Sequence, residues 1–312
     1  MNVLISGGLG FIGSNLIELI IENKFFNKVY ILDNNSISIK KKYIPYEKYE
    51  NIILINHDIS KYIDYDIDLD CIIHLAAKGN VIESINDPFN NLDINVKGTL
   101  NILEFARKKG ISKFIFSSTG GALMGNARLP VNESTIPMPI SPYGASKLSC
   151  EAYINAYSSM FKIKSYVLRF SNVFGPYCFH KKGVINKLFN SYINDSNFTI
   201  YGDGTSTRDY IYVKDIASAI LSCILDKGGK LKNIYHLSSN VETSLNALIK
   251  IFSKLSNKTV QIEYAPFRDG EVLRNFGDYK LAKNELGFEP NKDLESLIQK
   301  TFIWYKNFLR NE

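Results

Sequence analysis

The chain has 312 residues, of which 45% are hydrophobic, and a formal net charge of +6. This length allows a sizeable core arranged as two lobes or as one large domain. The positive charge is spread along the sequence without a basic tail, so the composition gives no indication of nucleic-acid binding.

Apolar runs, cysteines and histidines argue against three further classes of protein. No apolar run reaches membrane-spanning length, and the chain begins with a strand pattern rather than with a signal peptide. The cysteines show no CxxC spacing, which predicts reduced thiols, and the scattered histidines predict no metal site. We therefore expect a soluble, cytoplasmic protein that binds neither membranes nor nucleic acid. The residues concerned are Cys71, Cys150, Cys178, Cys223, His57, His74, His180 and His236.

Strand-like apolar runs alternate with helical patterns in the first half of the chain. The expected strands cover 2–6, 29–33, 52–55, 71–75, 113–117 and 165–169, and the expected helices cover 11–23, 91–109 and 143–161. This alternation predicts an α/β fold built on a doubly wound parallel sheet. After residue 170 the alternation stops, and loops containing Gly and Pro separate shorter elements. We expect a large lobe at 1–170 and a smaller α/β substrate lobe at 171–312, from which some segments return to the large lobe.

The first thirty-three residues combine an apolar run, a glycine-rich turn, a helical pattern and a second apolar run that ends in a carboxylate. Gly8 and Gly10 permit a tight turn close to a pyrophosphate, and Gly13 lets the helix pack on the strand. The helix N-terminus offers N–H groups to the phosphates. Asp33 lies twenty residues after Gly13, where a carboxylate can bind an adenosine ribose and would repel a 2′-phosphate. The pattern therefore predicts binding of NAD rather than NADP.

Tyr143 and Lys147 form a Tyr-x-x-x-Lys pair at the start of an expected helix, so both side chains lie on one helical face. A nearby ammonium favours the phenolate and is expected to lower the pKa of Tyr143, which would make it a general base. The same spacing occurs elsewhere in this sequence and also fits an exposed helix pair. Only this pair, however, follows a hydroxyl-rich strand end, Ser117-Ser118-Thr119, and opens a long helix.

Several motifs occur together in the order seen in extended short-chain dehydrogenases/reductases. They are the glycine loop, HLAA at 74–77, NVKGT at 95–99, SST at 117–119, PYGASK at 142–147, LRFSNVFGP at 168–176, YGDG at 201–204, TRDY at 207–210 and RDGE at 268–271. The chain resembles the nucleotide-sugar epimerase/dehydratase branch of that family over nearly its whole length, and within it the UDP-glucose 4-epimerases.

The resemblance implies roles for individual residues. An NAD-binding Rossmann domain would use Gly7, Gly10, Phe11, Ile12, Asp33, Asp58, Ile59, Leu75, Ala76, Ala77, Lys78, Tyr143 and Lys147. The catalytic residues would be Tyr143, Lys147 and Thr119, with Ser118 as the alternative hydroxyl. The sugar nucleotide would contact Thr119, Asn172, Val184, Ile185, Arg208, Arg268 and Asn275. For the two arginines the chemistry agrees, because a forked, permanent cation suits a diphosphate. The resemblance also implies a homodimer packed through helices near 91–109 and 143–161.

Two departures from the family pattern bear on the reaction and on the substrate. Dehydrating members place an acidic residue directly after the catalytic Thr, whereas Gly120 and Gly121 follow Thr119 here. The acid that would protonate a departing C6 hydroxyl is therefore missing. Asn275, seven residues after Arg268, corresponds to a position where a bulky side chain excludes N-acetyl groups in some epimerases. A smaller residue there would admit UDP-N-acetylglucosamine, and an uninvolved loop residue is the alternative.

The sequence therefore predicts reversible C4 epimerisation of a UDP-hexose or UDP-N-acetylhexosamine through a transient 4-keto sugar and bound NAD. Another family activity is the first alternative, either a 4,6-dehydratase or a 4-keto-sugar reductase. A non-catalytic NAD-sensing protein is the second, although a pure sensor has no need of a base such as Tyr143. Galactose metabolism and polysaccharide biosynthesis both remain open as the pathway served.

Overall fold

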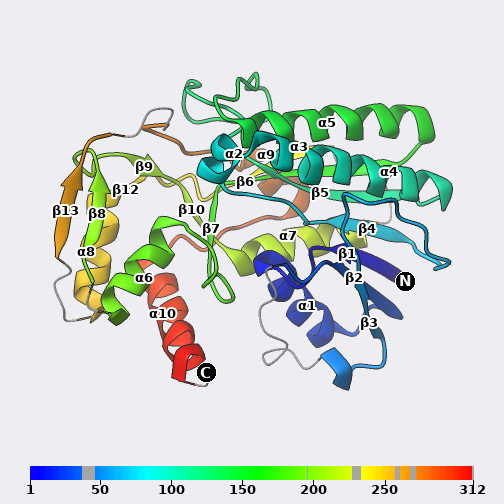
Figure 1. Cartoon of the computed structure of the whole chain (residues 1–312), viewed down its shortest axis with the longest axis horizontal. Coiled ribbons are helices and arrows are strands. Elements are labelled where there is room, and N and C mark those ends of the chain that lie inside the picture. The colour runs from blue at the N-terminus through cyan, green and yellow to red at the C-terminus, as the bar shows by residue number, and fades with distance from the viewer. Residues whose placement is uncertain (37–45, 195, 227–232, 257–260, 268–271, 311–312) are drawn as a thin grey trace.

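The computed structural model describes residues 1–36, 46–194, 196–226, 233–256, 261–267 and 272–310. A parallel sheet of seven strands, in the order β11-β6-β5-β4-β1-β2-β3, forms its centre (Figure 1). The strands are β1 (Asn2–Ser6), β2 (Lys28–Asp33), β3 (Ile52–Asn56), β4 (Cys71–His74), β5 (Lys113–Thr119), β6 (Lys164–Phe170) and β11 (Ile234–Leu237). The predicted doubly wound sheet is confirmed, with β11 as a strand that the sequence pattern did not predict.

Apolar side chains alternate between the two faces of the central strands. Val3 and Ile5 of β1 pack in the same cluster as α1 (Phe11–Asn23) and α7 (Val213–Leu225). Leu4 packs on the other face, with α4 (Gly98–Lys108) and α5 (Pro142–Phe161). Figure 1 shows these helix pairs on opposite sides of the sheet. Strands covered on both faces must be apolar throughout, which explains the uninterrupted hydrophobic runs of the sequence.

The single helix expected over 91–109 is divided into three pieces. A π-helical turn at Asp93–Lys97 separates α3 (Pro88–Leu92) from α4. The hydrophobic spacing fits both helix types over so few residues, so the sequence pattern could not distinguish them. Turns of this kind inside α-helices frequently mark functional sites.

Most of the chain after β6 builds a smaller group of strands and helices, called the smaller lobe below. Its strands pair as three two-stranded sheets: β7 (Asn172–Phe174) with β10 (Tyr210–Tyr212), β8 (Phe198–Tyr201) with β13 (Ile262–Ala265), and β9 (Thr207–Arg208) with β12 (Thr243–Ser244). Helices α6 (Val184–Asn194), α8 (Leu245–Ser256) and α10 (Leu294–Arg310) enclose a separate core with β7, β8 and β10. α7 and β11 lie instead with the central sheet, where α7 contacts α1.

Three short helices complete the described chain: the 3-10 turn Tyr46–Lys48, α2 (Val81–Asn86) and α9 (Lys280–Leu286). α2 lies beside α3 and contacts the start of the long helix α5 (Figure 1). Among the helices that the structure describes, none has the length and apolarity needed to cross a membrane.

Candidate active site

The glycine turn between β1 and α1 is packed so closely that side chains cannot be accommodated. Gly7 has a φ of +71°, and a Cβ added there would lie 2.6 Å from the backbone nitrogen of Ala76. A Cβ on Gly13 would lie 2.5 Å from the carbonyl oxygen of Gly8. Gly10 is the N-cap of α1 and provides no side-chain hydrogen bond to the first helical turn. The peptide N–H groups of Phe11 and Ile12 lie in the first helical turn, where they have no intrahelical acceptor, and therefore suit an anionic group such as a pyrophosphate.

Asp33 ends β2 beside this turn, as the sequence predicts. One carboxylate oxygen accepts the N–H of Leu9 at 3.1 Å, and the other accepts the N–H of Asn35 at 2.9 Å. Burial raises the pKa of Asp33, while these two hydrogen bonds oppose that rise. The carboxylate thus joins the loops that follow β1 and β2, at the edge where doubly wound sheets bind nucleotides.

The loops after β3 and β4 complete this edge of the sheet. The described residues here are Asp58, Ile59, Leu75, Ala76, Ala77 and Lys78. Ile59 is only 5% exposed and lies under Gly98, where an added Cβ would meet its Cδ1 at 2.7 Å. Its side chain is therefore a core contact, and its backbone carbonyl accepts a hydrogen bond from Asn101 at 2.8 Å. The close backbone, the uncapped helix and the acidic strand end together fit a dinucleotide such as NAD.

Asn95, at the centre of the π turn, orders the loop that carries Lys78. Its side-chain oxygen accepts the N–H of Lys78 at 2.8 Å, and its amide nitrogen donates to the carbonyl of Lys78 at 3.1 Å. The same nitrogen donates to the hydroxyl of Ser146 on α5 at 3.0 Å. The sequence pattern alone predicted no site role for Asn95. Its place in the NVKGT motif was the available signal.

Tyr143 and Lys147 are held at the start of α5 by a well-capped helix end. Ser141 accepts the N–H of Gly144 at 3.1 Å, and Pro142 occupies the first helical position. Thr119, at the end of β5, lies close enough to Tyr143 for its side chain to favour the phenolate and lower the pKa of Tyr143. Lys147 donates to the carbonyl of Ser117 at 2.8 Å. The structure thus brings the predicted tyrosine, threonine and lysine to one strand end.

The expected decrease in the pKa of Tyr143 is wrong for this structure. Burial raises that pKa to about 12, and the side chain of Thr119 only partly opposes the rise. Burial likewise lowers the pKa of Lys147 to about 8, with a smaller opposing effect of Cys150 and Glu151. Removal from water dominates because neither the phenolate nor the ammonium is well solvated there. Both shifts favour the neutral form of the group concerned, the phenol of Tyr143 and the amine of Lys147.

Ser118 and Thr119 point to opposite sides of β5, as neighbouring strand residues must. The hydroxyl of Ser118 donates to the carboxylate of Glu151 at 2.5 Å, and Ser118 is only 4% exposed. Arg169 grips the same carboxylate through two hydrogen bonds, at 3.0 and 2.7 Å. The geometry therefore favours Thr119 over Ser118 as the hydroxyl that assists Tyr143.

The smaller lobe carries the remaining predicted residues. Asn172 opens β7 and is exposed, whereas Ile185 is 4% exposed and belongs to the core of that lobe. Val184 is partly buried beside it. Arg208 donates to the carbonyl of its neighbour Thr207 at 2.8 Å. Arg268 lies outside the described residues.

Asn275 is 3% exposed, and its side-chain nitrogen is buried without a hydrogen-bond partner within the described part of the chain. Its side-chain oxygen faces Gly121, where an added Cβ would approach to 3.3 Å. Asn275 thus lies next to the glycine pair that follows Thr119. An unsatisfied buried donor is unfavourable unless a ligand acceptor completes it.

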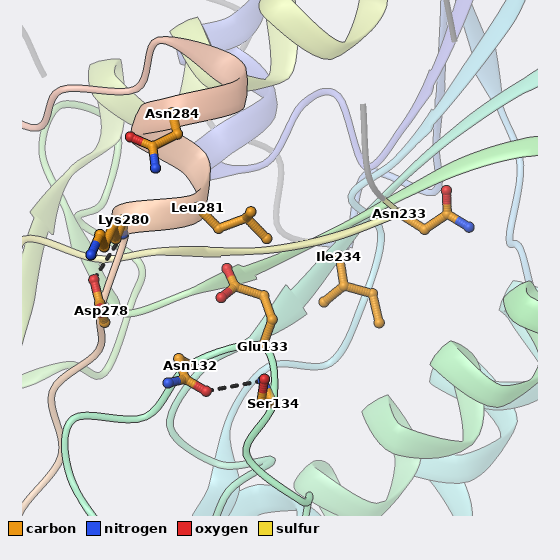
Figure 2. Close-up of a pocket in the computed structure, with 9 residues that line it drawn as sticks. All are labelled: Asn132, Glu133, Ser134, Asn233, Ile234, Asp278, Lys280, Leu281 and Asn284. Carbon is orange, nitrogen blue, oxygen red and sulfur yellow. Dashed lines mark hydrogen bonds between the residues drawn. The ribbon is translucent and has the colours of Figure 1, made fainter. Parts of the chain in front are cut away.

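A hollow of about 720 Å³ lies away from these residues, beside the edge strand β11 (Figure 2). Glu133 projects into it and accepts the N–H of His236 at 2.7 Å, which covers part of the open edge of the sheet. Its walls are Asn132, Glu133, Ser134, Asn233, Ile234, Asp278, Lys280, Leu281 and Asn284. None of the predicted site residues lines it. No cluster of metal-binding side chains occurs among the residues described.

Comparison with known proteins places this geometry in a family. The family described as GDP-mannose 4,6 dehydratase matches residues 4–301. The UDP-glucose 4-epimerase of Thermotoga maritima, solved with UDP-glucose, is 32% identical with a TM-score of 0.89 and covers 99% of this chain and 100% of its own. The UDP-N-acetylglucosamine 4-epimerase of Methanobrevibacter ruminantium, solved with UDP-N-acetylmuramic acid, is 30% identical with a TM-score of 0.88 and covers 98% of both chains. The UDP-glucuronic acid 4-epimerase of Bacillus cereus, solved with UDP-glucuronic acid and NAD, is 26% identical with a TM-score of 0.89 and covers 98% of this chain and 99% of its own.

Proposed function

This chain belongs to the family described as GDP-mannose 4,6 dehydratase, among the extended short-chain dehydrogenases/reductases, and on that premise we propose that it is an NAD-dependent nucleotide-sugar 4-epimerase. Its substrate is a UDP-hexose or a UDP-N-acetylhexosamine. The observation that carries the proposal is the gathering of Thr119, Tyr143 and Lys147 at the end of β5, with Lys147 one helical turn after Tyr143 on α5.

NAD is the cofactor in this proposal, and the glycine turn supports it. The residues proposed to hold it are Gly7, Gly10, Phe11, Ile12, Asp33, Asp58, Ile59, Leu75, Ala76, Ala77, Lys78, Tyr143 and Lys147. The packing around Gly7 and Gly13 leaves a turn of bare backbone, and Asp33 would repel a 2′-phosphate. The B. cereus epimerase, which binds NAD in its crystal structure, is a further support.

When bound, NAD accepts the hydride from C4 of the sugar and returns it to the opposite face. Tyr143 takes the proton of the C4 hydroxyl, directly or through Thr119, and returns a proton at the end of the cycle. Lys147 stabilises the phenolate and contacts the nicotinamide ribose. Enclosure of the 4-keto sugar protects it from loss to solvent. No external reductant is needed.

The dehydratase alternative lacks an acid at the required place. Gly120 and Gly121 follow Thr119, and an added Cβ on Gly120 would lie 3.3 Å from the ring of His236. Burial lowers the pKa of His236 to about 3, so this ring is a poor proton donor. Glu151 lies on the other side of β5, held by Arg169. These contacts favour epimerisation over loss of the C6 hydroxyl.

Asn275 supports N-acetylated sugars as substrates. Its side chain is small, and its unsatisfied nitrogen can donate to the carbonyl oxygen of an acetamido group. We expect Asn275→Tyr to lower kcat/KM for UDP-N-acetylglucosamine at least ~10-fold relative to UDP-glucose, because one filled pocket discriminates by about 1–3 kcal/mol. Steady-state kinetics with both sugars test this. An unchanged ratio would show that Asn275 does not face the acetamido group.

The remaining substrate contacts are also proposals. Thr119, Asn172, Val184, Arg208 and Arg268 are proposed to contact the sugar nucleotide through their side chains, and Ile185 through its backbone, because its side chain is a core contact. The division at residue 170 into a cofactor lobe and a sugar-nucleotide lobe is proposed too, with α7 and β11 counted in the cofactor lobe. Their hydrogen-bonding and packing partners in the central sheet support that assignment.

We also propose a homodimer in the cytoplasm. Apolar side chains on α3 and α5 are unusually exposed, and these helices lie against each other (Figure 1). The four cysteines are free thiols buried in the structure, which supports a reducing compartment. Supply of sugars for polysaccharide biosynthesis is the pathway proposed.

The test of the activity is a proton NMR time course with UDP-N-acetylglucosamine and then UDP-glucose, without added reductant. Signals of the C4 epimer are the expected result. A 4-keto-6-deoxy product would replace the epimerase by a dehydratase. NAD binding without turnover of either sugar would favour a sensor.

A further inference from the structure

Asp209 is a fully buried carboxylate between β9 and β10, with 0% of the residue exposed. One of its oxygens accepts both the N–H and the hydroxyl of Ser239, each at 2.8 Å. The other oxygen accepts the N–H of Asn240 at 3.1 Å and the N–H of Gly277 at 3.2 Å. The carboxylate therefore joins three separate segments of the chain.

Each of these segments carries a residue proposed to contact the sugar nucleotide or borders the central sheet. Gly277 lies two residues after Asn275, whose own N–H donates to the carbonyl of Thr207 at 3.3 Å. Ser239 follows β11, the edge strand of the seven-stranded sheet. The bond from Gly277 thus fixes the Asn275 segment against the end of the large sheet.

The backbone of Asp209 serves the other two proposed contacts. Its carbonyl accepts the N–H of Asn172 at 2.9 Å, at the start of the β7–β10 pair. Arg208 is the preceding residue. Asp209 is therefore linked to all three proposed contacts. It is covalently bonded to Arg208, and its carbonyl is hydrogen-bonded to Asn172. Its side chain is hydrogen-bonded to the chain two residues after Asn275.

A buried carboxylate at this position requires hydrogen-bond donors in fixed places, whereas an apolar side chain would not. All four of its donors within the described part of the chain are uncharged N–H or O–H groups. A buried carboxylate is tolerated only when its oxygens are fully hydrogen-bonded. The donors must hence stay in place, and the three segments with them. Burial raises the pKa of Asp209, which agrees with this surrounding.

We propose that Asp209 is the positioning residue of the sugar-nucleotide site, fixing Arg208 and the Asn275 segment in the relative placement that a UDP-sugar requires. This inference rests on the proposed epimerase function. Asp209 acts through its neighbours and does not itself contact the substrate.

The test compares three variants of the NAD-loaded enzyme. Asp209→Asn keeps the size of the side chain but turns one acceptor into a donor that faces N–H groups. Ser239→Ala removes a single hydroxyl donor and leaves the carboxylate intact. Asp215→Asn is the matched control, because this partly buried carboxylate on α7 accepts one N–H, from Asn291 at 3.0 Å. Titration calorimetry with UDP, kinetics with the UDP-sugar and the bound NAD content are measured for each.

We expect Asp209→Asn to raise the Kd for UDP and the KM at least ~10-fold, a change of about 1.4 kcal/mol. The expected kcat stays within a factor of ~3 and the NAD content is unchanged, because Tyr143, Thr119 and the glycine turn lie on other elements. Ser239→Ala should show a smaller change in the same direction. Asp215→Asn should match the wild type.

Equal UDP affinity for Asp209→Asn and Asp215→Asn would overturn the inference. A parallel loss of kcat, NAD content and melting temperature would also overturn it, since a merely structural role predicts that pattern. If Asp209→Asn does not fold, unchanged UDP binding by Ser239→Ala overturns it. A wild type that binds UDP but epimerises no sugar contradicts the proposed function alone, whereas a wild type that does not bind UDP contradicts both.

Discussion

Tyr143 and Thr119 supply the two hydroxyls of the proposed proton transfer, one from α5 and one from the end of β5. Replacing Tyr143 with Phe removes the phenolic oxygen and keeps the ring. We expect turnover to fall by ~10²- to 10⁴-fold, the usual contribution of general acid–base catalysis. Bound NAD and the melting temperature should stay unchanged, because the ring packing is retained. Proton NMR of the sugars measures turnover, the absorbance of released NAD measures the cofactor content, and thermal unfolding gives the melting temperature.

The control for that variant is Tyr153→Phe, which removes the hydroxyl of a residue that is 42% exposed on the same helix. It should retain wild-type turnover. Near-normal activity of Tyr143→Phe would mean that another group takes the proton.

Burial of the charged Lys147 side chain opposes folding, because the ammonium loses its contact with water. Its ammonium has a pKa of about 8 in the folded chain, against an ordinary value of 10.5. A base with a lowered folded-state pKa binds fewer protons when folded, so stability rises with pH between these two values. Below pH 8 the buried charge costs roughly 3 kcal/mol before its hydrogen bond to Ser117 is counted.

We therefore expect Lys147→Met to be inactive yet more stable than the wild type at pH 7. This difference in stability should shrink as the pH approaches 10. Near that pH the lysine of the unfolded chain is itself close to its pKa, so deprotonation on folding costs little free energy. Thermal unfolding at pH 7, 8.5 and 10 measures the difference. A gap between the two proteins that does not change with pH would show that burial of the charge is not its cause.

At the scale of elements, the sequence predicts the structure correctly where local residues alone determine a strand or the end of a helix. β1, α1 and the start of α5 follow from an apolar run, a glycine turn and a Ser-Pro cap, all of which are visible in the sequence. β11 and α7 were not recognised as parts of the large sheet layer. Their partners, β6 and α1, are distant in sequence, and hydrophobic periodicity carries no information about such pairing. The same holds for the site residues. The opposite directions of Ser118 and Thr119 follow from the alternation of side chains along a strand, which is local. The raised pKa of Tyr143 depends on burial, which segments distant in sequence create.

The π turn at Asp93–Lys97 carries Asn95, whose side chain makes two hydrogen bonds to the backbone of Lys78 in the loop after β4. Asn95→Ala would leave the partly buried N–H of Lys78 without its acceptor, while the carbonyl of Lys78 keeps the amide nitrogen of Asn91 as a donor at 3.1 Å. We expect a loss of about 1–3 kcal/mol in the free energy of unfolding, the cost of an unsatisfied polar group. NAD affinity should fall as well, because the loop after β4 borders the cofactor.

Urea denaturation and NAD titration test this expectation. Asn51→Ala is the matched control, since it removes one hydrogen bond, to the carbonyl of Phe26 at 3.3 Å, remote from the site. Equal losses in both variants would show that the Asn95 contacts have no special role.

At the scale of the whole molecule, α3 and α5 carry several large apolar side chains that are exposed, and they are the surface on which the proposed dimer would form. Phe89 is 83% exposed, Leu92 53% and Met160 71%. Aromatic and Met side chains are enriched in protein interfaces, which makes α3 and α5 the candidate contact surface. Two copies of this chain meeting through this surface would cover all three side chains, because a two-fold interface buries the same patch on each copy.

Phe89→Glu places a carboxylate in that contact on each copy. Like charges brought together and desolvated cost several kcal/mol, so we expect the dimer to dissociate. Light scattering after size exclusion should give twice the chain mass of 35.4 kDa for the wild type and the chain mass for the variant. Tyr264→Glu is the control, because Tyr264 is 67% exposed on β13 in the smaller lobe, on the far side of the molecule from α5 (Figure 1). A monomeric wild type would refute the dimer, and dissociation by Tyr264→Glu alone would move the interface to the smaller lobe.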